Sequence, residues 1–221
     1  MKKTAIILGA TGLTGGILLK KLIAYPSFEK IKLFSRYSVK MDSPKIEEHL
    51  IDLLELEKHA EKFKADVVFC CIGTTKSQTP DKEKYKKIDY GIPVTAARLS
   101  KLNGIKNFIV ISALGADADS SIFYNKTKGE MERDVLNQKI ENSYILQPSL
   151  IVGDRNEQRL GEKIVTFLMT AFNFLVPKKY KKIKAETIAE AMRMLAHNGF
   201  WKSRIPSEEI KTIAAHARNR T

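Results

Sequence analysis

Three residues in the middle of the chain have the types and the spacing needed for proton transfer. Ser112 ends the apolar stretch FIVIS, Tyr124 follows twelve residues later in YNKTKGE, and Lys128 lies four positions beyond it. On a helix, residues four apart lie on one face, so the lysine ammonium can sit beside the phenol. A nearby positive charge favours the phenolate and lowers the tyrosine pKa. Such a tyrosine can exchange a proton with a carbonyl oxygen, to which Ser112 would donate a hydrogen bond.

The same Tyr-x-x-x-Lys spacing occurs a second time, at Tyr180 and Lys184. That pair lies in the basic stretch KKYKKIK, and no strand ending in serine precedes it. We interpret it as coincidental, because lysine is common in this chain. Tyr124 differs in that it follows a serine-ending strand and begins a predicted helix. A helix with an incidental tyrosine and lysine remains the alternative.

A glycine-rich turn near the amino terminus, GATGLTGG, has the features of a phosphate-binding turn. Gly9 permits a tight turn, Gly12 allows a ligand phosphate to approach the backbone, and Gly15 allows the next helix to pack closely on the strand. The helix N-terminus attracts a pyrophosphate, and Thr11 and Thr14 can add hydroxyl donors. No Gly-Lys-Ser/Thr sequence follows, which excludes a triphosphate P-loop. A glycine turn without a ligand is the alternative.

The end of the second predicted strand indicates which dinucleotide is bound. An acidic residue there holds the ribose of NAD, whereas an arginine suits the 2′-phosphate of NADP. The strand ends in LFSRYS, with Arg36 and no carboxylate, so the sequence favours NADP(H) over NAD(H). Asp52 and Leu53 could contact the adenine. Ile72 and Gly73 follow the next strand and would lie beside the cofactor, although ordinary loop roles remain the alternative for all four.

Short aliphatic strands alternate with helices along most of the chain. The predicted strands are 4–10, 30–36, 65–73, 104–116 and 142–153, and the predicted helices are 12–25, 52–63, 82–103, 123–138 and much of 161–197. This alternation is typical of a parallel sheet covered on both faces. We therefore predict an α/β fold, a doubly wound parallel-sheet Rossmann-like sandwich of three α/β/α layers. One domain spans 1–221, with 155–221 forming a small helical part on the substrate side.

The composition limits the compartment and the partners. The chain has 221 residues, a formal net charge of +13 and two adjacent cysteines, Cys70 and Cys71. Neighbours on a strand point to opposite faces and do not form an ordinary disulfide, and the apolar run after MKK is too short for a signal peptide. We therefore predict a cytoplasmic protein. The scattered lysines favour a solvated basic surface and a phosphorylated ligand over a specific nucleic-acid partner, and we predict no metal site.

The apolar run 164–177, followed by the basic stretch 178–184, allows two interpretations. A run that is apolar on nearly all sides is typical of a buried helix, here one that closes a substrate cleft. An interfacial helix with a basic flank would instead contact an anionic membrane surface. The first interpretation is favoured.

The chain resembles the short-chain dehydrogenase/reductase superfamily, in its atypical branch, and more closely the oxidoreductase group that includes the Tat-interacting protein. The matching stretches, which span roughly residues 4–200, are GATGLTGG, the arginine in LFSRYS, FCCIGTTK, VISALGAD, YNKTKGEMER and ILQPSLIVGDRNEQR. The resemblance implies an NADP-binding Rossmann-like fold with Ser112, Tyr124 and Lys128 at the catalytic positions.

Further cofactor contacts follow from the same resemblance. It implies that Lys128 contacts the nicotinamide ribose and that 148–152, including Pro148 and Leu150, closes over the nicotinamide. Leu13, in the glycine turn, completes the expected contacts.

Two positions depart from the family pattern. Tyr37 stands where relatives often carry a second basic residue beside Arg36, which weakens the preference for NADP. Asp89 stands where extended members place an asparagine, so an asparagine-dependent proton relay is not expected. Fewer than 100 residues follow Lys128, too few for the substrate domain of nucleotide-sugar epimerases, and we expect a small pocket.

These features predict an NADP(H)-dependent oxidoreductase that transfers hydride between a nicotinamide and a small carbonyl or alcohol substrate. The alternative is a non-catalytic NADP(H)-binding regulatory or scaffold protein. Relatives of that kind usually lose the tyrosine or the lysine, and both are present here, which favours the enzyme.

Overall fold

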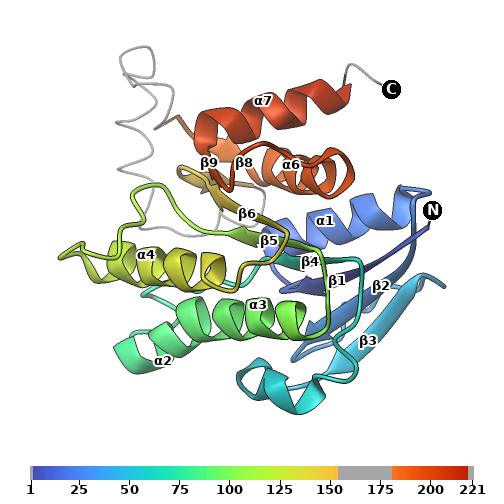
Figure 1. Cartoon of the computed structure of the whole chain (residues 1–221), viewed down its shortest axis with the longest axis horizontal. Helices are drawn as coiled ribbons and strands as arrows, with labels where there is room; N and C mark the ends of the chain where they lie inside the picture. The colour runs from blue at the N-terminus through green and yellow to red at the C-terminus, as the bar shows by residue number, and fades with distance from the viewer. Residues whose placement is uncertain (1, 154–180, 219–221) are drawn as a thin grey trace.

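A seven-stranded parallel sheet forms the centre of the computed structural model, which describes residues 2–153 and 181–218 (Figure 1). The strand order is β3-β2-β1-β4-β5-β6-β9, and each neighbouring pair is parallel. The strands are β1 (Lys3–Leu8), β2 (Phe28–Ser35), β3 (Ile46–Leu50), β4 (Val67–Cys70), β5 (Asn107–Ile111), β6 (Asn142–Gln147) and β9 (Arg204–Pro206).

Helices cover both faces of this sheet, as Figure 1 shows. One face carries α1 (Leu13–Ala24), α6 (Ala185–Asn198) and α7 (Ser207–Arg218). The other carries the 3₁₀ helix η1 (Leu53–His59), α2 (Lys82–Lys86), the π-helical turn η2 (Lys87–Gly91), α3 (Ile92–Leu102) and α4 (Phe123–Leu136). The predicted three-layer α/β/α sandwich is confirmed.

The sequence of β1 shows why both faces are covered. Successive strand residues point to opposite faces, and here Ala5 and Ile7 enter one core while Ile6 and Leu8 enter the other. All four side chains are fully buried, and burial of each of the larger ones contributes about 1.5–3 kcal/mol. A run of aliphatic residues without polar interruption therefore requires helices on both sides.

The strand order reverses between β1 and β4. The chain passes from β1 outward to β2 and β3 and then returns to place β4 on the other side of β1. In sheets of this kind, ligands bind in the crevice outside the carboxyl ends of the strands at the reversal. Gly9 directly follows β1 and Cys71 directly follows β4, so the glycine turn lies at this position.

Three elements of the first 153 residues differ from the predictions. The edge strand β3 was not predicted, because its polar sequence IEEHL lacks an aliphatic run. The helix predicted over 52–63 is the shorter 3₁₀ helix η1. The strand predicted over 142–153 divides at Pro148, which has no N–H to continue the ladder; β6 ends before it, and β7 (Ile151–Val152) pairs instead with β8 (Ile183–Lys184).

The described part of the C-terminal region completes the sandwich. Helix α6 packs against α1 and α7, and β9 extends the sheet beside β6; β9 and α7 were not predicted. The run 164–177 and residues 178–180 of the basic stretch, which include Tyr180, lie outside the described residues, so the substrate-side helical part stays a prediction. Within 2–153 and 181–218, no helix has the length and apolar character to cross a membrane.

Candidate NAD(P)H site and Tyr-Lys pair

The glycine turn brings β1, β4 and α1 into close contact. Gly9 has φ +86°, a left-handed conformation that favours glycine. A Cβ at Gly9 would lie 2.8 Å from the carbonyl oxygen of Cys71, and a Cβ at Gly15 would overlap the carbonyl oxygen of Gly9. The predicted tight turn at Gly9 and the predicted close helix–strand packing at Gly15 are both confirmed.

The N-terminus of α1 offers donors to an anion. The N-cap is Gly12, which has no side chain to accept hydrogen bonds from the first N–H groups, and the first turn contains no acidic residue. The first N–H groups of a helix have no partner within it and carry a partial positive charge. Thr14 is buried at this end, whereas Thr11 is exposed. A pyrophosphate fits this backbone cradle, which side chains at Gly9 or Gly15 would distort.

A cleft of about 610 Å³ opens beside the turn, within the range of small-molecule sites. It is bordered by the glycine turn, the first turns of α1, the loop after β2 and the start of α6, and its lining includes Thr11, Gly12, Leu13, Ser38, Val39 and Glu186. The carboxylate of Glu48 accepts hydrogen bonds from Ser38 Oγ and the Val39 N–H, both at 2.8 Å, so it holds this loop in place.

The carboxyl end of β2 presents an exposed cation. Ser35 is buried and donates to the Tyr37 carbonyl oxygen at 2.8 Å. Arg36 is exposed, and its guanidinium carbon lies 5.7 Å from the centroid of the Tyr37 ring. The strand end therefore carries a positive group and no carboxylate of its own.

The residues expected to contact the adenine and the nicotinamide differ in their burial and in their partners. The Asp52 carboxylate caps η1 by accepting from the Leu54 N–H at 3.0 Å, and Leu53 is buried in the core. Ile72 lies against Gly9, because its Cδ1 is 3.2 Å from a Cβ placed there. Gly73 is exposed.

The segment after β6 approaches the glycine turn. A Cβ placed on Gly153 would lie 3.0 Å from Leu13 Cδ2, so the end of this segment contacts the start of α1. The carbonyl of Pro148 accepts from the Leu114 N–H at 2.9 Å, and the side chain of Leu150 is 40% exposed. The segment thus spans from the end of β6 to the turn, where it could cover a cofactor.

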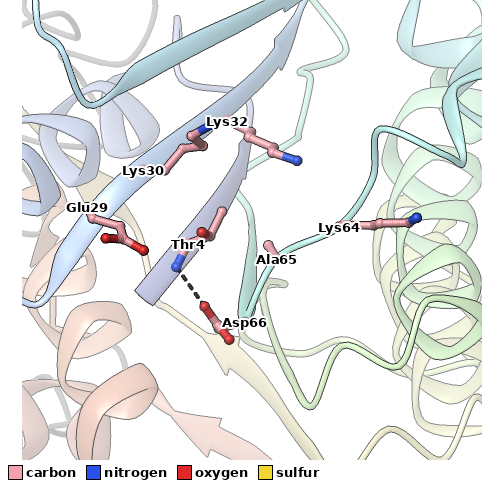
Figure 2. A pocket seen from close by; sticks show the side chains of 7 residues that line it. All are labelled: Thr4, Glu29, Lys30, Lys32, Lys64, Ala65 and Asp66. Carbon is pink, nitrogen blue, oxygen red and sulfur yellow. Dashed lines mark hydrogen bonds between the residues drawn. The ribbon is translucent and has the colours of Figure 1, made fainter. Parts of the chain in front are cut away.

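A second hollow, of about 600 Å³, lies at the amino ends of the strands, at the end of the sheet opposite the glycine turn. Figure 2 shows the side chains that line it. Its lining includes Lys30, Lys32 and Lys64, and the Thr4 N–H donates to Asp66 Oδ2 at 2.7 Å. Thr4 and Asp66 stand at the amino ends of β1 and β4. This hollow therefore faces away from the glycine turn. Its volume is similar to that of the cleft beside the turn, so the position at the strand reversal, and not the volume, identifies the cleft as the candidate site.

Tyr124 and Lys128 lie on α4 as predicted, but a buried carboxylate accompanies them. Lys128 is 4% exposed, and its Nζ lies 2.8 Å from Oδ2 of Asp89, which is 1% exposed. Asp89 Oδ1 accepts from the Thr74 N–H at 2.7 Å. A Cβ on Gly73 would lie 3.9 Å from Asp89 Oδ2 and 4.0 Å from Lys128 Nζ. The pair therefore stands directly behind the loop that follows β4.

The predicted lowering of the Tyr124 pKa is wrong in this structure. Partial burial raises the pKa of Tyr124, Lys128 lowers it, and Asp89 raises it again, so the net pKa lies above the ordinary tyrosine value. Burial also disfavours the ammonium of Lys128, but Asp89 outweighs it and the pKa of Lys128 is raised. The lysine is charged, and its effect on the phenol is opposed by its own counterion.

Ser112 is committed to a different partner. It is buried, and its Oγ donates to Glu132 Oε1 at 2.6 Å. The same buried carboxylate accepts from Gln147 Nε2 at 2.9 and 3.1 Å and from Arg204 Nε at 2.8 Å. Glu132 lies eight residues after Tyr124, about 12 Å along the helix. The structure thus brings Tyr124, Lys128 and Asp89 together and directs the Ser112 hydroxyl to Glu132.

The sequence did not predict the carboxylate partners of Lys128 and Ser112. Asp89 was noted only as a replacement for asparagine, and its ion pair with Lys128 joins residues 39 positions apart. Glu132 continues the four-residue spacing of Tyr124 and Lys128 on the same helix face. That spacing was the available signal, although it does not indicate that Ser112 would be the partner.

Comparisons with known proteins identify the family. A family model described as NAD(P)H-binding matches residues 9–151. The rat protein HTATIP2 (Rattus norvegicus) is 30% identical over 200 residues, 89% of this chain and 81% of that protein. The protein FMP52-1, mitochondrial, of Scheffersomyces stipitis is 34% identical over 163 residues, 71% of this chain and 70% of that protein.

Solved structures share the fold at low identity. The Bordetella bronchiseptica enzyme WbmH in complex with NAD+ superposes with a TM-score of 0.70 at 13% identity, covering 93% of this chain and 75% of that one. UDP-glucose 4-epimerase of Thermotoga maritima gives a TM-score of 0.68 at 13% identity, with 88% and 73% covered. These likenesses show the Rossmann-like fold alone.

One prediction from composition is contradicted by these comparisons. The sequence favoured a cytoplasmic protein, but the fungal relatives from Scheffersomyces stipitis, Candida albicans and Eremothecium gossypii are all named mitochondrial. The cytoplasmic prediction is therefore wrong. Cysteine usage and a short apolar run gave no information that separates these compartments.

The glycine turn at the strand reversal, the uncapped helix behind it and the matching family model lead to one conclusion: the chain belongs to the NAD(P)H-binding family, with a short-chain dehydrogenase-like fold and with HTATIP2 among its relatives.

Proposed function

We propose that this protein is an NADP(H)-dependent oxidoreductase that transfers hydride between a nicotinamide and a small carbonyl or alcohol substrate. The observation that carries the proposal is the position of Lys128, whose Nζ lies 4.0 Å from a Cβ placed on Gly73. Gly73 follows Cys71 and Ile72, which contact Gly9. A proton-transfer pair and a dinucleotide cradle therefore adjoin the same loop.

The side chains have distinct roles in this proposal. When bound, the reduced nicotinamide supplies a hydride to the carbonyl carbon and becomes oxidised. Tyr124 gives its phenolic proton to the carbonyl oxygen, and the ion pair of Lys128 with Asp89 lies behind the phenol. The partly exposed Tyr124 side chain can reach a substrate, whereas the buried Lys128 acts from behind it.

Ser112 requires a change of partner to bind the substrate oxygen. Its hydroxyl would have to leave Glu132, a charge-assisted hydrogen bond whose net contribution is about 1.5–3 kcal/mol. Gln147 and Arg204 would still hold that carboxylate, so no buried charge would be left unpaired. In this proposal, Ser112 turns toward the carbonyl oxygen and stabilises charge on it.

The proposed preference for NADP(H) rests on the end of β2. Arg36 is exposed there and can pair with a 2′-phosphate. The nearby Glu48 is engaged with the loop at Ser38 and Val39, so it is not directed to a ribose hydroxyl.

The test replaces the phenol and keeps the cradle. We expect Tyr124→Phe to abolish NADPH-dependent reduction in a screen of small aldehydes and ketones, because the proton donor is removed. NADPH binding, followed by cofactor fluorescence, should change less than about twofold, since Tyr124 adds little to pyrophosphate binding. Tyr25→Phe, at the far end of α1, is the matched control. Full activity in Tyr124→Phe would contradict the mechanism.

A second candidate function is cofactor binding without turnover. It is favoured by the engagement of Ser112 with Glu132 and of Lys128 with Asp89. NADPH binding in the wild type without reduction of any carbonyl in the screen would support this regulatory or scaffold role.

A further inference from the structure

We propose that Asp89 is the positioning residue that sets the protonation state of Tyr124: its carboxylate cancels the charge of Lys128, so that Tyr124 stays a phenol, the form that donates a proton in carbonyl reduction. This inference rests on the proposed function and deepens it. It names a residue and a protonation state that the Ser-Tyr-Lys pattern does not contain.

The carboxylate of Asp89 lies close enough to the ammonium of Lys128 to neutralise its charge. Asp89 and Lys128 are both almost fully buried, with 2.8 Å between Oδ2 and Nζ. The second carboxylate oxygen is fixed by the Thr74 N–H at 2.7 Å. Asp89 projects from the π-helical turn η2 between α2 and α3, and such turns occur frequently at functional sites.

Within 2–153 and 181–218, the titratable groups that face this pair lie on α4, α2 and β4. Tyr124 lies one turn before Lys128 on α4. Tyr85, on α2, is buried, and burial, Asp89 and Tyr124 together raise its pKa, so it remains a phenol. Cys70, at the end of β4, is fully buried, and burial raises the pKa of its thiol to about 12. The charged groups of this cluster are the ion-paired Lys128 and Asp89, and their charges are opposite.

This charge balance fixes what Tyr124 can do. An isolated ammonium within about 4–6 Å would lower a tyrosine pKa by roughly one to three units. With Asp89 present, the ammonium already has its counterion and gains little from a second anion. Tyr124 therefore gives one proton to the carbonyl oxygen for each hydride delivered to the carbonyl carbon, and the phenolate recovers a proton from solvent. The reverse reaction needs the phenolate at the start, which Asp89 opposes.

The experiment measures the ionisation of Tyr124 directly, without cofactor or substrate. Protein labelled with ¹³C at the tyrosine Cζ is titrated through the alkaline range by NMR, and the Tyr124 signal is assigned by its loss in Tyr124→Phe. We expect the wild type to titrate above the ordinary value of about 10. In Asp89→Asn we expect the midpoint to fall by about one unit or more, because the buried ammonium then gains a counterion only when Tyr124 ionises.

Two further variants complete the test. Asp119→Asn removes an exposed carboxylate from the loop before α4 and should leave the Tyr124 midpoint unchanged. The double variant Asp89→Asn/Lys128→Met removes both members of the buried ion pair, so it also covers the case in which Asp89→Asn does not fold. If Asp89 cancels Lys128, the double variant should titrate within about half a unit of the wild type.

Two results would overturn the inference. One is a Tyr124 midpoint in Asp89→Asn equal to or above that of the wild type. The other is a rise of about one unit or more in the double variant, which would mean that Lys128 acts on the phenol without compensation. Because the titration needs no turnover, a failed carbonyl screen would overturn the proposed function and leave this result standing on its own.

Discussion

Replacing Gly15 by alanine tests whether the glycine turn needs its close helix–strand contact. The added methyl group would overlap the carbonyl oxygen of Gly9, and it would lie 2.8 Å from that carbonyl carbon and 3.2 Å from Ala10 Cα. All three are backbone atoms, which cannot rotate away as a side chain would. Either α1 must move away from β1 or the turn must change its shape.

The magnitude follows from two opposing effects. Overpacking of this kind costs up to about 3 kcal/mol, and alanine regains about 1 kcal/mol over glycine inside a helix. We expect a net loss of about 2 kcal/mol in the free energy of unfolding. The displaced N–H groups of α1 should also weaken NADPH binding by at least tenfold, which corresponds to about 1.4 kcal/mol.

The assay is urea denaturation followed by circular dichroism, with cofactor titration on the same samples. Gly91→Ala is the matched control, because a Cβ there would have its nearest neighbour at 4.0 Å and should be neutral or stabilising. Equal stability and equal NADPH affinity in Gly15→Ala and the wild type would refute the requirement for glycine at this contact.

Two more predictions concern charge. Arg36→Ala should raise the Kd for NADPH about tenfold, a loss of about 1.4 kcal/mol, and leave NADH binding unchanged in parallel fluorescence titrations; equal effects on both cofactors would contradict recognition of a 2′-phosphate. Burial raises the pKa of Glu190, but Arg193 and Lys21 outweigh it and hold the pKa below the ordinary value. The ionised Glu190 therefore stabilises the folded protein fully above its unfolded pKa of about 4.3, and this stabilisation is lost as the pH falls through the folded pKa. In Glu190→Gln the acid-induced loss of unfolding free energy should shrink by about 1 kcal/mol, whereas the exposed Glu61→Gln should follow the wild type; identical acid profiles in all three would contradict the pairing.

The sequence by itself determined the layout of the sandwich and the place of the glycine turn. The aliphatic runs of β1 and β4 can be buried only between two helical layers, Gly9 is required by the left-handed φ of its own turn, and Gly15 is required by contacts within that turn. The four-residue spacing of Tyr124 and Lys128 likewise fixes their common helix face. These are local constraints, so they can be read without knowing which distant segments meet.

The tertiary structure alone decided what surrounds the reactive side chains. Asp89 reaches Lys128 and Glu132 reaches Ser112 across distances of 39 and 20 positions in the chain, through the packing of η2 and β5 against α4. A pKa depends on all charges and on the burial around a group, so the sequence pattern predicted a lowered Tyr124 pKa where the fold raises it. The edge strand β3 was also missed, because its pairing with β2, rather than its own polar sequence, makes it a strand.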